Sequence, residues 1–142
     1  MRLLLDANVL LDCLVEESTG EPRTGKAASE AVFQMCDDGE HEGLIAWQTL
    51  CIISYFYERM HSAAKTGEMI DGLLAVLEVP TVGSWEASRW RTHGISDVED
   101  ALQVACAVSG HADFIITRNV KDFLASSVPA ITPEHFLSGV AV

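Results

Sequence analysis

Arg2-Leu3-Leu4-Leu5-Asp6-Ala7-Asn8-Val9-Leu10-Leu11-Asp12 is the stretch that decides the fold, because an apolar run stops at an acid and then resumes with a different period. Leu3 to Leu5 form the short, continuous apolar run that is typical of a buried strand. Beyond Asp6 the apolar residues recur at helical spacing. Asp6 is therefore expected where a strand becomes a helix, and in open α/β sheets that edge is where ligands bind.

The same alternation of apolar strands and amphipathic helices continues along the chain. Strands are expected at 44–46, 78–82, 113–117 and 128–131, and helices at 26–36, 48–61, 67–77, 84–91, 96–110 and from Pro133 onward, with a loop at 16–25. Pro80 favours an edge position or a strand end, and Ser84 and Thr132 are the expected helix caps. Because no break in composition divides the 142 residues, the pattern predicts one α/β domain over residues 1–142, with a mainly parallel sheet and helices on both faces.

The bulk composition limits the possible function classes. A chain that is 49% hydrophobic and 21% charged is globular, and none of its apolar runs has the length of a membrane span. The four cysteines are widely scattered, which favours reduced thiols in the cytoplasm over a disulfide framework. A net charge of −12 argues against a long nucleic-acid groove. Any nucleic-acid contact must be small, with a metal ion or a basic partner supplying the missing positive charge.

Four acids are expected to converge at the sheet edge that Asp6 marks. Asp97 and Asp100 are three residues apart in the first turn of a helix, so they share one side, whereas Glu99 is expected to point elsewhere. Asp122 follows a predicted strand and reaches the same edge as Asp6 if the two strands are neighbours. Acids in a first turn also cap the helix and complement its dipole, so capping remains an alternative for Asp97 and Asp100.

Gathered carboxylates need a cation, because two of them about 4 Å apart repel by roughly 4 kcal/mol at an effective dielectric constant near 20. Oxygen ligands without cysteine or histidine favour Mg²⁺ or Mn²⁺, and such an ion can activate a water against a phosphodiester. Thr117 and Asn119 can hold a metal-bound water or the scissile phosphate, and Arg118 can contact a flanking phosphate. Ordinary loop capping is the alternative for these three residues.

Three segments together resemble the PIN-domain family, especially its bacterial and archaeal branch close to the VapC-type toxins: Leu4 to Asp12, Asp97 to Gln103, and Ile116 to Phe123. The ending from Thr132 to Leu137 also looks like that branch, so the resemblance covers essentially the whole chain. It implies a PIN-like three-layer α/β/α sandwich, a ribonuclease that depends on Mg²⁺ or Mn²⁺, and often an antitoxin partner and a homodimer.

The resemblance also assigns residues. It implies acidic metal ligands at Asp6, Asp100 and Asp122, a supporting acid at Asp97, and accessory roles for Asn8, Thr117 and Asn119. The family commonly has a glutamate early in its third helix, and the matching segment from Ala46 to Ile53 has no acid. Glu58 comes more than one turn later and is not expected to be a ligand, so Asp97 is the candidate that fills the gap.

The favoured hypothesis is a cytoplasmic, metal-dependent endoribonuclease that is the toxin of a toxin–antitoxin pair. Its antitoxin would insert an Arg or Lys among the four acids, and the apolar helices at 48–61 and 67–77 predict a two-fold homodimer. One alternative is a PIN fold that binds RNA or a protein without cutting. A second is a phosphoryl-accepting receiver domain, which needs an acidic pair at the first strand and a Lys after the last, and this chain has neither.

Overall fold

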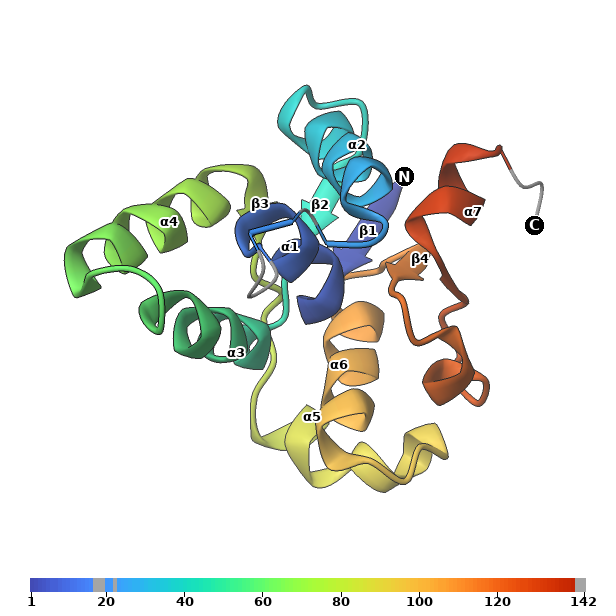
Figure 1. Ribbon diagram of the computed structural model, residues 1–142. Helices are drawn as coiled ribbons and strands as arrows, with labels where there is room; N and C mark the ends of the chain where they lie inside the picture. The colour runs from blue at the N-terminus through green and yellow to red at the C-terminus, as the bar shows by residue number, and fades with distance from the viewer. Residues whose placement is uncertain (17–19, 22, 140–142) are drawn as a thin grey trace.

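The computed structural model describes residues 1–16, 20–21 and 23–139, so the predicted loop at 16–25 lies partly outside the described residues. The strands are β1 (Arg2–Leu5), β2 (Glu42–Leu44), β3 (Leu77–Glu78), β4 (Phe114–Ile116) and β5 (Ala130–Ile131). The helices are α1 (Ala7–Leu14), α2 (Lys26–Asp37), α3 (Trp47–Glu58), α4 (Ala63–Val76), α5 (Ser84–Ser88), α6 (Val98–Ser109) and α7 (Pro133–Leu137), with 3-10 turns η1 (Trp90–His93) and η2 (Val120–Phe123) (Figure 1).

The strands form one parallel sheet in the order β3-β2-β1-β4-β5. The chain builds the sheet outward from β1 to β2 and β3, and then returns to add β4 and β5 on the other side of β1. The strand order therefore reverses between β1 and β4, where Leu5 lies opposite Ile116. A reversal of this kind opens a crevice at the carboxyl ends of the two strands, which is the usual ligand position in an α/β sheet.

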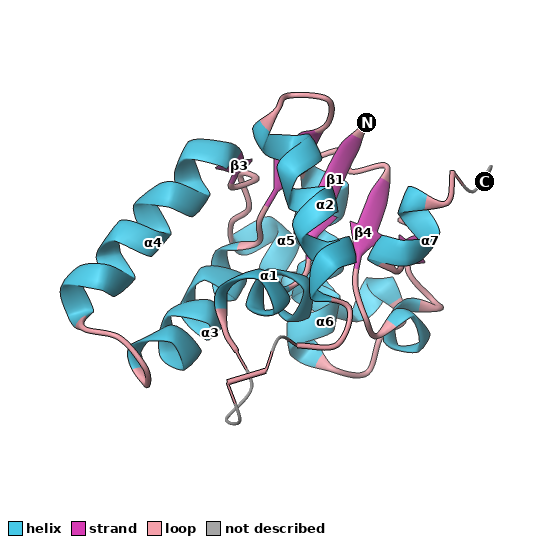
Figure 2. Ribbon diagram, turned by 45° about the horizontal axis from the view of Figure 1, so that its top comes forward, coloured by secondary structure: helices cyan, strands magenta, loops and turns pink. Residues whose placement is uncertain are grey.

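Helices cover both faces of the sheet, which confirms the predicted α/β/α architecture (Figure 2). Successive residues of β1 point to opposite faces. Leu3 and Leu5 pack in a core with residues of α1, α2 and α3, whereas Leu4 packs in a second core with Ala101 and Val104 of α6. Because all three leucines are fully buried, packed helices on both faces of the sheet fix the end of β1, where Asp6 follows.

Several element boundaries differ from the sequence-based expectation. Helix α4 begins at Ala63, not at residue 67, because the Ser62 side chain caps it by accepting a hydrogen bond from the Lys65 N–H. Strand β2 ends at Leu44, and β3 covers only two residues, although its predicted edge position is confirmed. The expected cap at Ser84 is wrong, since Gly83 occupies the cap position there.

The final helix begins as expected. Thr132 caps α7 through the His135 N–H, and Pro133 occupies its first turn. Within the described part of the chain, no helix combines the length and the hydropathy that crossing a bilayer requires.

Candidate active site

Asp6 lies directly after β1, at the point where the strand order reverses. Its backbone N–H donates to the Ile116 carbonyl at the end of β4, 3.0 Å away, so the ends of the two strands are tied together. Its side chain caps α1 by accepting a hydrogen bond from the Ala7 N–H at 2.7 Å. The residue is only 7% exposed. The predicted junction of strand and helix is therefore present, with an acid buried in it.

Four donors surround the Asp6 carboxylate. Oδ1 accepts hydrogen bonds from the Ala7 N–H and from Gln103 Nε2 at 2.9 Å. Oδ2 accepts hydrogen bonds from the Thr117 hydroxyl at 2.6 Å and from Asn8 Nδ2 at 2.9 Å. A carboxylate has about four acceptor positions, so its hydrogen-bonding capacity is filled. Burial nevertheless raises the pKa of Asp6, and the charge of Asp122 raises it further, while the Thr117, Ala7 and Asn8 hydrogen bonds act in the opposite direction.

The loop after β4 is joined to the same cluster. The Arg118 backbone N–H donates to Asn8 Oδ1 at 3.0 Å, and the Asn119 backbone N–H donates to Thr117 Oγ1 at 3.0 Å. Thr117 is fully buried. The structure thus places Asn8 and Thr117 directly on Asp6, and Asn119 contributes to the cluster through its main chain.

A second group of acids opens helix α6. Asp97 caps the helix by accepting a hydrogen bond from the Asp100 N–H at 3.0 Å, so the capping interpretation of Asp97 is confirmed. Among the described residues, Asp97, Glu99 and Asp100 each place one carboxylate oxygen within 4.8 Å of the others. The expectation that Glu99 points elsewhere is wrong, because the start of α6 packs against the Asp6 edge and turns Glu99 toward the other acids.

The charges of this group disfavour full ionisation. Burial raises the pKa of Glu99 to about 7, with further contributions from the charges of Asp6, Asp100 and Asp97. Burial also raises the pKa of Asp100 to about 6, helped by the charges of Asp97, Asp6 and Asp122. Within the described chain, Glu99 Oε1 is buried without a hydrogen-bond partner. A set of hard oxygen donors that includes an unpartnered buried oxygen fits a divalent cation.

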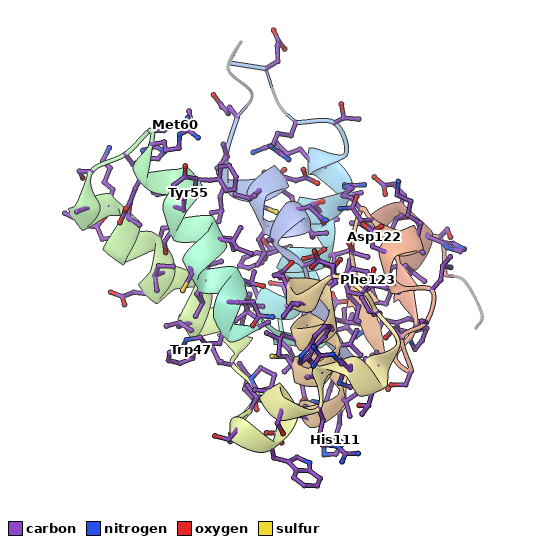
Figure 3. All side chains as sticks on the ribbon, turned by 90° about the horizontal axis from the view of Figure 1, so that it is seen from below. Trp47, Tyr55, Met60, His111, Asp122 and Phe123 are labelled. Atoms are coloured by element: carbon purple, nitrogen blue, oxygen red, sulfur yellow. The ribbon has the colours of Figure 1, made fainter. Side chains whose placement is uncertain are left out.

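Asp122 completes the predicted set from turn η2 (Figure 3). It lines a hollow of about 310 Å³ together with Asp97 and Asp100, and its charge acts on both Asp6 and Asp100. Lys121 is the only cationic side chain among the described residues that line this hollow. The four predicted acids therefore surround one region, with Asp6 at its buried side and Asp97 and Asp122 at its exposed side.

Arg118 does not have the position that was expected of it. Its Nε donates to Asp12 Oδ2 at 2.9 Å, its Nη1 to Glu134 Oε2 at 2.6 Å, and its Nη2 to the Gly25 carbonyl at 2.6 Å and to Ser29 Oγ at 2.8 Å. All three guanidinium nitrogens donate within the fold. This corrects the expected contact with a flanking phosphate, since Arg118 instead braces the loop that carries Thr117.

Two residues at the site were missed by sequence reasoning. Gln103 is fully buried, and while its Nε2 donates to Asp6, its Oε1 accepts a hydrogen bond from the Thr49 hydroxyl at 3.1 Å. Glu99 is the other. A signal for Gln103 was present, because it is a lone polar residue inside the apolar part of α6 and lies one helical turn after Asp100.

Comparisons with known proteins agree with this fold. A family model described as the PIN domain matches residues 2–121. A search of curated proteins finds no match of significance. Among solved structures, the chain is similar to VapBC2 from Rickettsia felis bound to a DNA fragment from their promoter, at a TM-score of 0.65 and 16% identity over 93% of this chain and 98% of that one.

Two further solved structures show the same fold. VapBC-1 from nontypeable Haemophilus influenzae has a TM-score of 0.64 and 17% identity, and covers 94% of this chain and 99% of its own. FitAcB from Neisseria gonorrhoeae has a TM-score of 0.62 and 17% identity, and covers 94% of this chain and 99% of its own. At these identities, the likeness concerns the arrangement of the elements.

Proposed function

Because the chain belongs to the PIN-domain family, whose members are generally nucleases that use divalent metals, we propose that it is a metal-dependent endoribonuclease and the toxin of a toxin–antitoxin pair. The observation that carries the proposal is the convergence of acids where the strand order reverses, with a buried carboxylate oxygen of Glu99 that has no partner in the described chain. A divalent ion is the ligand that such a set of oxygens lacks.

The residues have separate roles in this proposal. Asp6, Asp100 and Asp122 would hold a Mg²⁺ or Mn²⁺ ion, which when bound would supply positive charge for the phosphodiester and would lower the pKa of an attacking water. Thr117, Asn8 and Gln103 fix the orientation of the Asp6 carboxylate through their hydrogen bonds. Lys121, in the same hollow, takes the phosphate contact that Arg118 cannot make.

Glu99 is the acid that compensates for the absent glutamate of α3. Sequence reasoning gave that place to Asp97, but Asp97 already accepts the Asp100 N–H and is exposed, whereas Glu99 Oε1 is buried and unpartnered in the described chain. In this role Glu99 adds a carboxylate oxygen within 4.8 Å of those of Asp97 and Asp100. The ligand set then comes from the ends of β1 and β4 and from the start of α6, with none from α3.

One observation favours a second candidate function, a PIN fold that binds RNA or a protein without cutting. The Asp6 carboxylate already accepts four hydrogen bonds, so an ion that binds it directly must displace a donor. In a non-catalytic module those bonds would remain intact and the acids would serve only to attract a basic partner.

A cleavage assay separates the two candidates. With Mn²⁺ and a single-stranded RNA labelled at its end, we expect the parent protein to cut and Asp122→Asn and Glu99→Gln to lose at least about tenfold in rate, since each loses an anionic ligand. Glu58→Gln is the matched control, because it makes the same change of charge at an exposed acid on α3, and it should cut like the parent. A parent that binds RNA but does not cut it with any divalent ion would favour the non-catalytic candidate.

The proposed antitoxin is a small protein with a basic tail. The VapBC and FitAB structures are complexes of the two proteins that their names give, and the acidic hollow of this chain suits an Arg or Lys that takes the place of the ion's charge. A partner that co-purifies should therefore lose inhibition when that basic residue is changed to Ala. A partner whose inhibitory segment has no basic residue, or which binds the opposite face, would contradict this proposal.

A further inference from the structure

A tryptophan lies exposed on the short helix next to α6. Trp85 of α5 is 68% exposed, although tryptophan is among the largest apolar side chains. The Arg89 guanidinium lies over its ring, 4.7 Å from the centroid, and Arg91 lies over the ring of Trp90 in the same way at 4.4 Å. Two cations and two indole rings therefore share one short surface segment, which we call the Trp85 platform (residues 85–93).

The Trp85 platform borders a hollow of about 280 Å³ on the side of α6. Trp85, Arg89 and His93 form one wall of the hollow, and Ala105 and Val108 of α6 lie opposite them. The volume is near the lower limit for a small-molecule pocket. Glu86, Thr92 and Ser109 also line the hollow. The hollow thus combines an indole ring and apolar side chains with two nitrogen-bearing side chains, two hydroxyls and one carboxylate, in a space that suits one planar group with polar edges.

The charge of the platform differs from that of the whole molecule. The net charge of the chain is −12, and Arg2, Arg23, Lys26 and Arg118 are each paired with carboxylates. Within the described part of the chain, no carboxylate lies within ion-pair distance of Arg89 or Arg91, and their partners are indole rings instead. Glu86, the acid within the platform, accepts a hydrogen bond from the Gly83 N–H, and the two arginine charges exceed its single negative charge. The net positive charge of the platform is therefore available to an anionic ligand, which an acidic surface elsewhere would repel.

The platform is continuous with the acidic site. It ends at His93, and the next two residues, Gly94 and Ile95, line the acidic hollow. Helix α6 borders both hollows, and His93 of one hollow and Gly94 of the other are consecutive residues, about 3.8 Å apart at their Cα atoms. One short single strand can therefore lie across both hollows.

We propose that the Trp85 platform binds a base of single-stranded RNA that flanks the scissile phosphate, with Trp85 stacking on the base and Arg89 holding the adjacent phosphate. The inference rests on the proposed nuclease function and gives that function a substrate-binding subsite. Base stacking on aromatic side chains and cation–π contacts from Arg are the usual means of binding single strands without sequence-specific hydrogen bonds. A contact with one base and one phosphate also needs few cationic side chains, which suits a chain as acidic as this one.

Binding is measured without metal so that cleavage plays no part. A fluorescently labelled single-stranded RNA of twelve nucleotides is titrated in EDTA at low salt, and its anisotropy gives the dissociation constant. We expect Trp85→Ala and Arg89→Ala each to weaken binding about tenfold, a loss of the size that one stacked base contributes. Trp47→Ala and Lys65→Ala are the controls, because Trp47 is 66% exposed on α3 (Figure 3) and Lys65 is an exposed cation on α4. Both should bind like the parent.

Three results would overturn the proposal: no RNA binding by the parent, no loss on changing Trp85 and Arg89, or an equal loss in the two controls. If the Trp85 and Arg89 variants bind RNA like the parent but lose the binding of a protein partner, the platform is a protein-binding surface and the proposal fails.

The nuclease proposal is tested separately in the same samples by adding Mn²⁺. If Trp85-dependent binding is present and cleavage is absent, only the nuclease proposal fails. If cleavage is present and independent of Trp85 at all RNA concentrations, only the platform proposal fails.

Discussion

Gln103 is the residue through which α3 and α6 reach the buried acid. Its amide donates to Asp6 and accepts from Thr49, so a chain of hydrogen bonds runs from α3 to the end of β1. A buried amide is stabilising only when its polar atoms have hydrogen-bond partners. If one member of a hydrogen bond is removed, the other is left buried without a partner, which lowers the free energy of unfolding. Gln103 therefore fixes the Asp6 side chain and at the same time depends on it.

Changing Gln103 to Met keeps the size of the side chain and removes both hydrogen bonds. We expect the free energy of unfolding to fall by about 1–3 kcal/mol, because the Thr49 hydroxyl loses its acceptor and Asp6 Oδ1 keeps only one donor. Urea denaturation measures the change. Gln34→Met is the control, since the Gln34 side chain is exposed on α2, and it should change stability by less than about 0.5 kcal/mol. Equal effects of the two variants would contradict the role given to Gln103.

The raised pKa values of Glu99 and Asp100 predict how stability depends on pH. A carboxyl whose pKa is higher in the folded than in the unfolded protein binds its proton more tightly when folded, so its stabilisation is complete at low pH and is lost as the pH rises through the folded-state value. With pKa values of about 7 and about 6, the metal-free protein should melt at lower temperature at pH 8 than at pH 5.

Two variants test the origin of this slope. Glu99→Gln and Asp100→Asn should each flatten the dependence of melting temperature on pH between 5 and 8, because they remove a group that titrates in this range. Glu58→Gln should retain the full slope. A parent protein whose melting temperature rises over the same interval in EDTA would show that the acids do not repel one another as the structure indicates.

At the scale of elements, Arg118 holds the loop after β4 to three helices. Its guanidinium contacts Asp12 of α1, Ser29 of α2 and Glu134 of α7, and also the carbonyl of Gly25. Gly25 has φ +85, and a Cβ there would lie 2.2 Å from Arg118 Nη2, so a side chain at this position would push the guanidinium away. The loop that carries Thr117 is thus fixed by described residues from three distant parts of the sequence.

Replacing Arg118 by Met should cost about 3 kcal/mol of stability, because Asp12 is buried and, among the described residues, would keep only Arg23 as its ionic partner. The double variant Asp12→Asn with Arg118→Met should recover part of that loss, since no uncompensated buried charge remains. Chemical denaturation measures both. If Arg118→Met alone costs less than about 1 kcal/mol, the network does not brace the loop.

The elements also show how far the sequence could predict the structure. The alternation of apolar runs predicted the order of strands and helices. Asp6, directly after β1, and Asp122, in the loop that follows β4, were expected at one edge because the strands of a parallel sheet end there. Helix ends were less predictable: Gly67 lies inside α4, and the side chain of Ser62 decides where that helix begins. Glu99, Gln103 and the partners of Arg118 depend on how helices turn against the sheet, which periodicity alone does not specify.

At the scale of the whole molecule, α3 and α4 extend together to one side of the sheet (Figure 1). Tyr55 and Phe56 of α3, Met60 just after it and Leu74 of α4 are all exposed. An apolar surface of this kind is typical of an interface between proteins. The two-fold homodimer that the sequence predicts stays a prediction, and these helices are the surface that we propose for it.

Light scattering at tens of micromolar should show a dimer. Phe56→Glu should give a monomer, because a buried charge without a partner is costly in an apolar interface. Leu137→Glu is the control: Leu137 on α7 is 41% exposed, as is Phe56, but it lies outside the proposed interface, so this variant should remain a dimer. A monomeric parent would exclude the homodimer.

The central claim is that the converging acids bind a divalent ion, and the response of the melting temperature to Mn²⁺ tests it most directly. At about 100 times the dissociation constant, Mn²⁺ should stabilise the parent by about 2.7 kcal/mol, which is several degrees for a domain of this size. Asp100→Asn should melt no lower than the parent in EDTA, because repulsion is relieved, and should lose most of the Mn²⁺ shift. A parent without a shift, or an Asp100→Asn variant with the full shift, would contradict the claim.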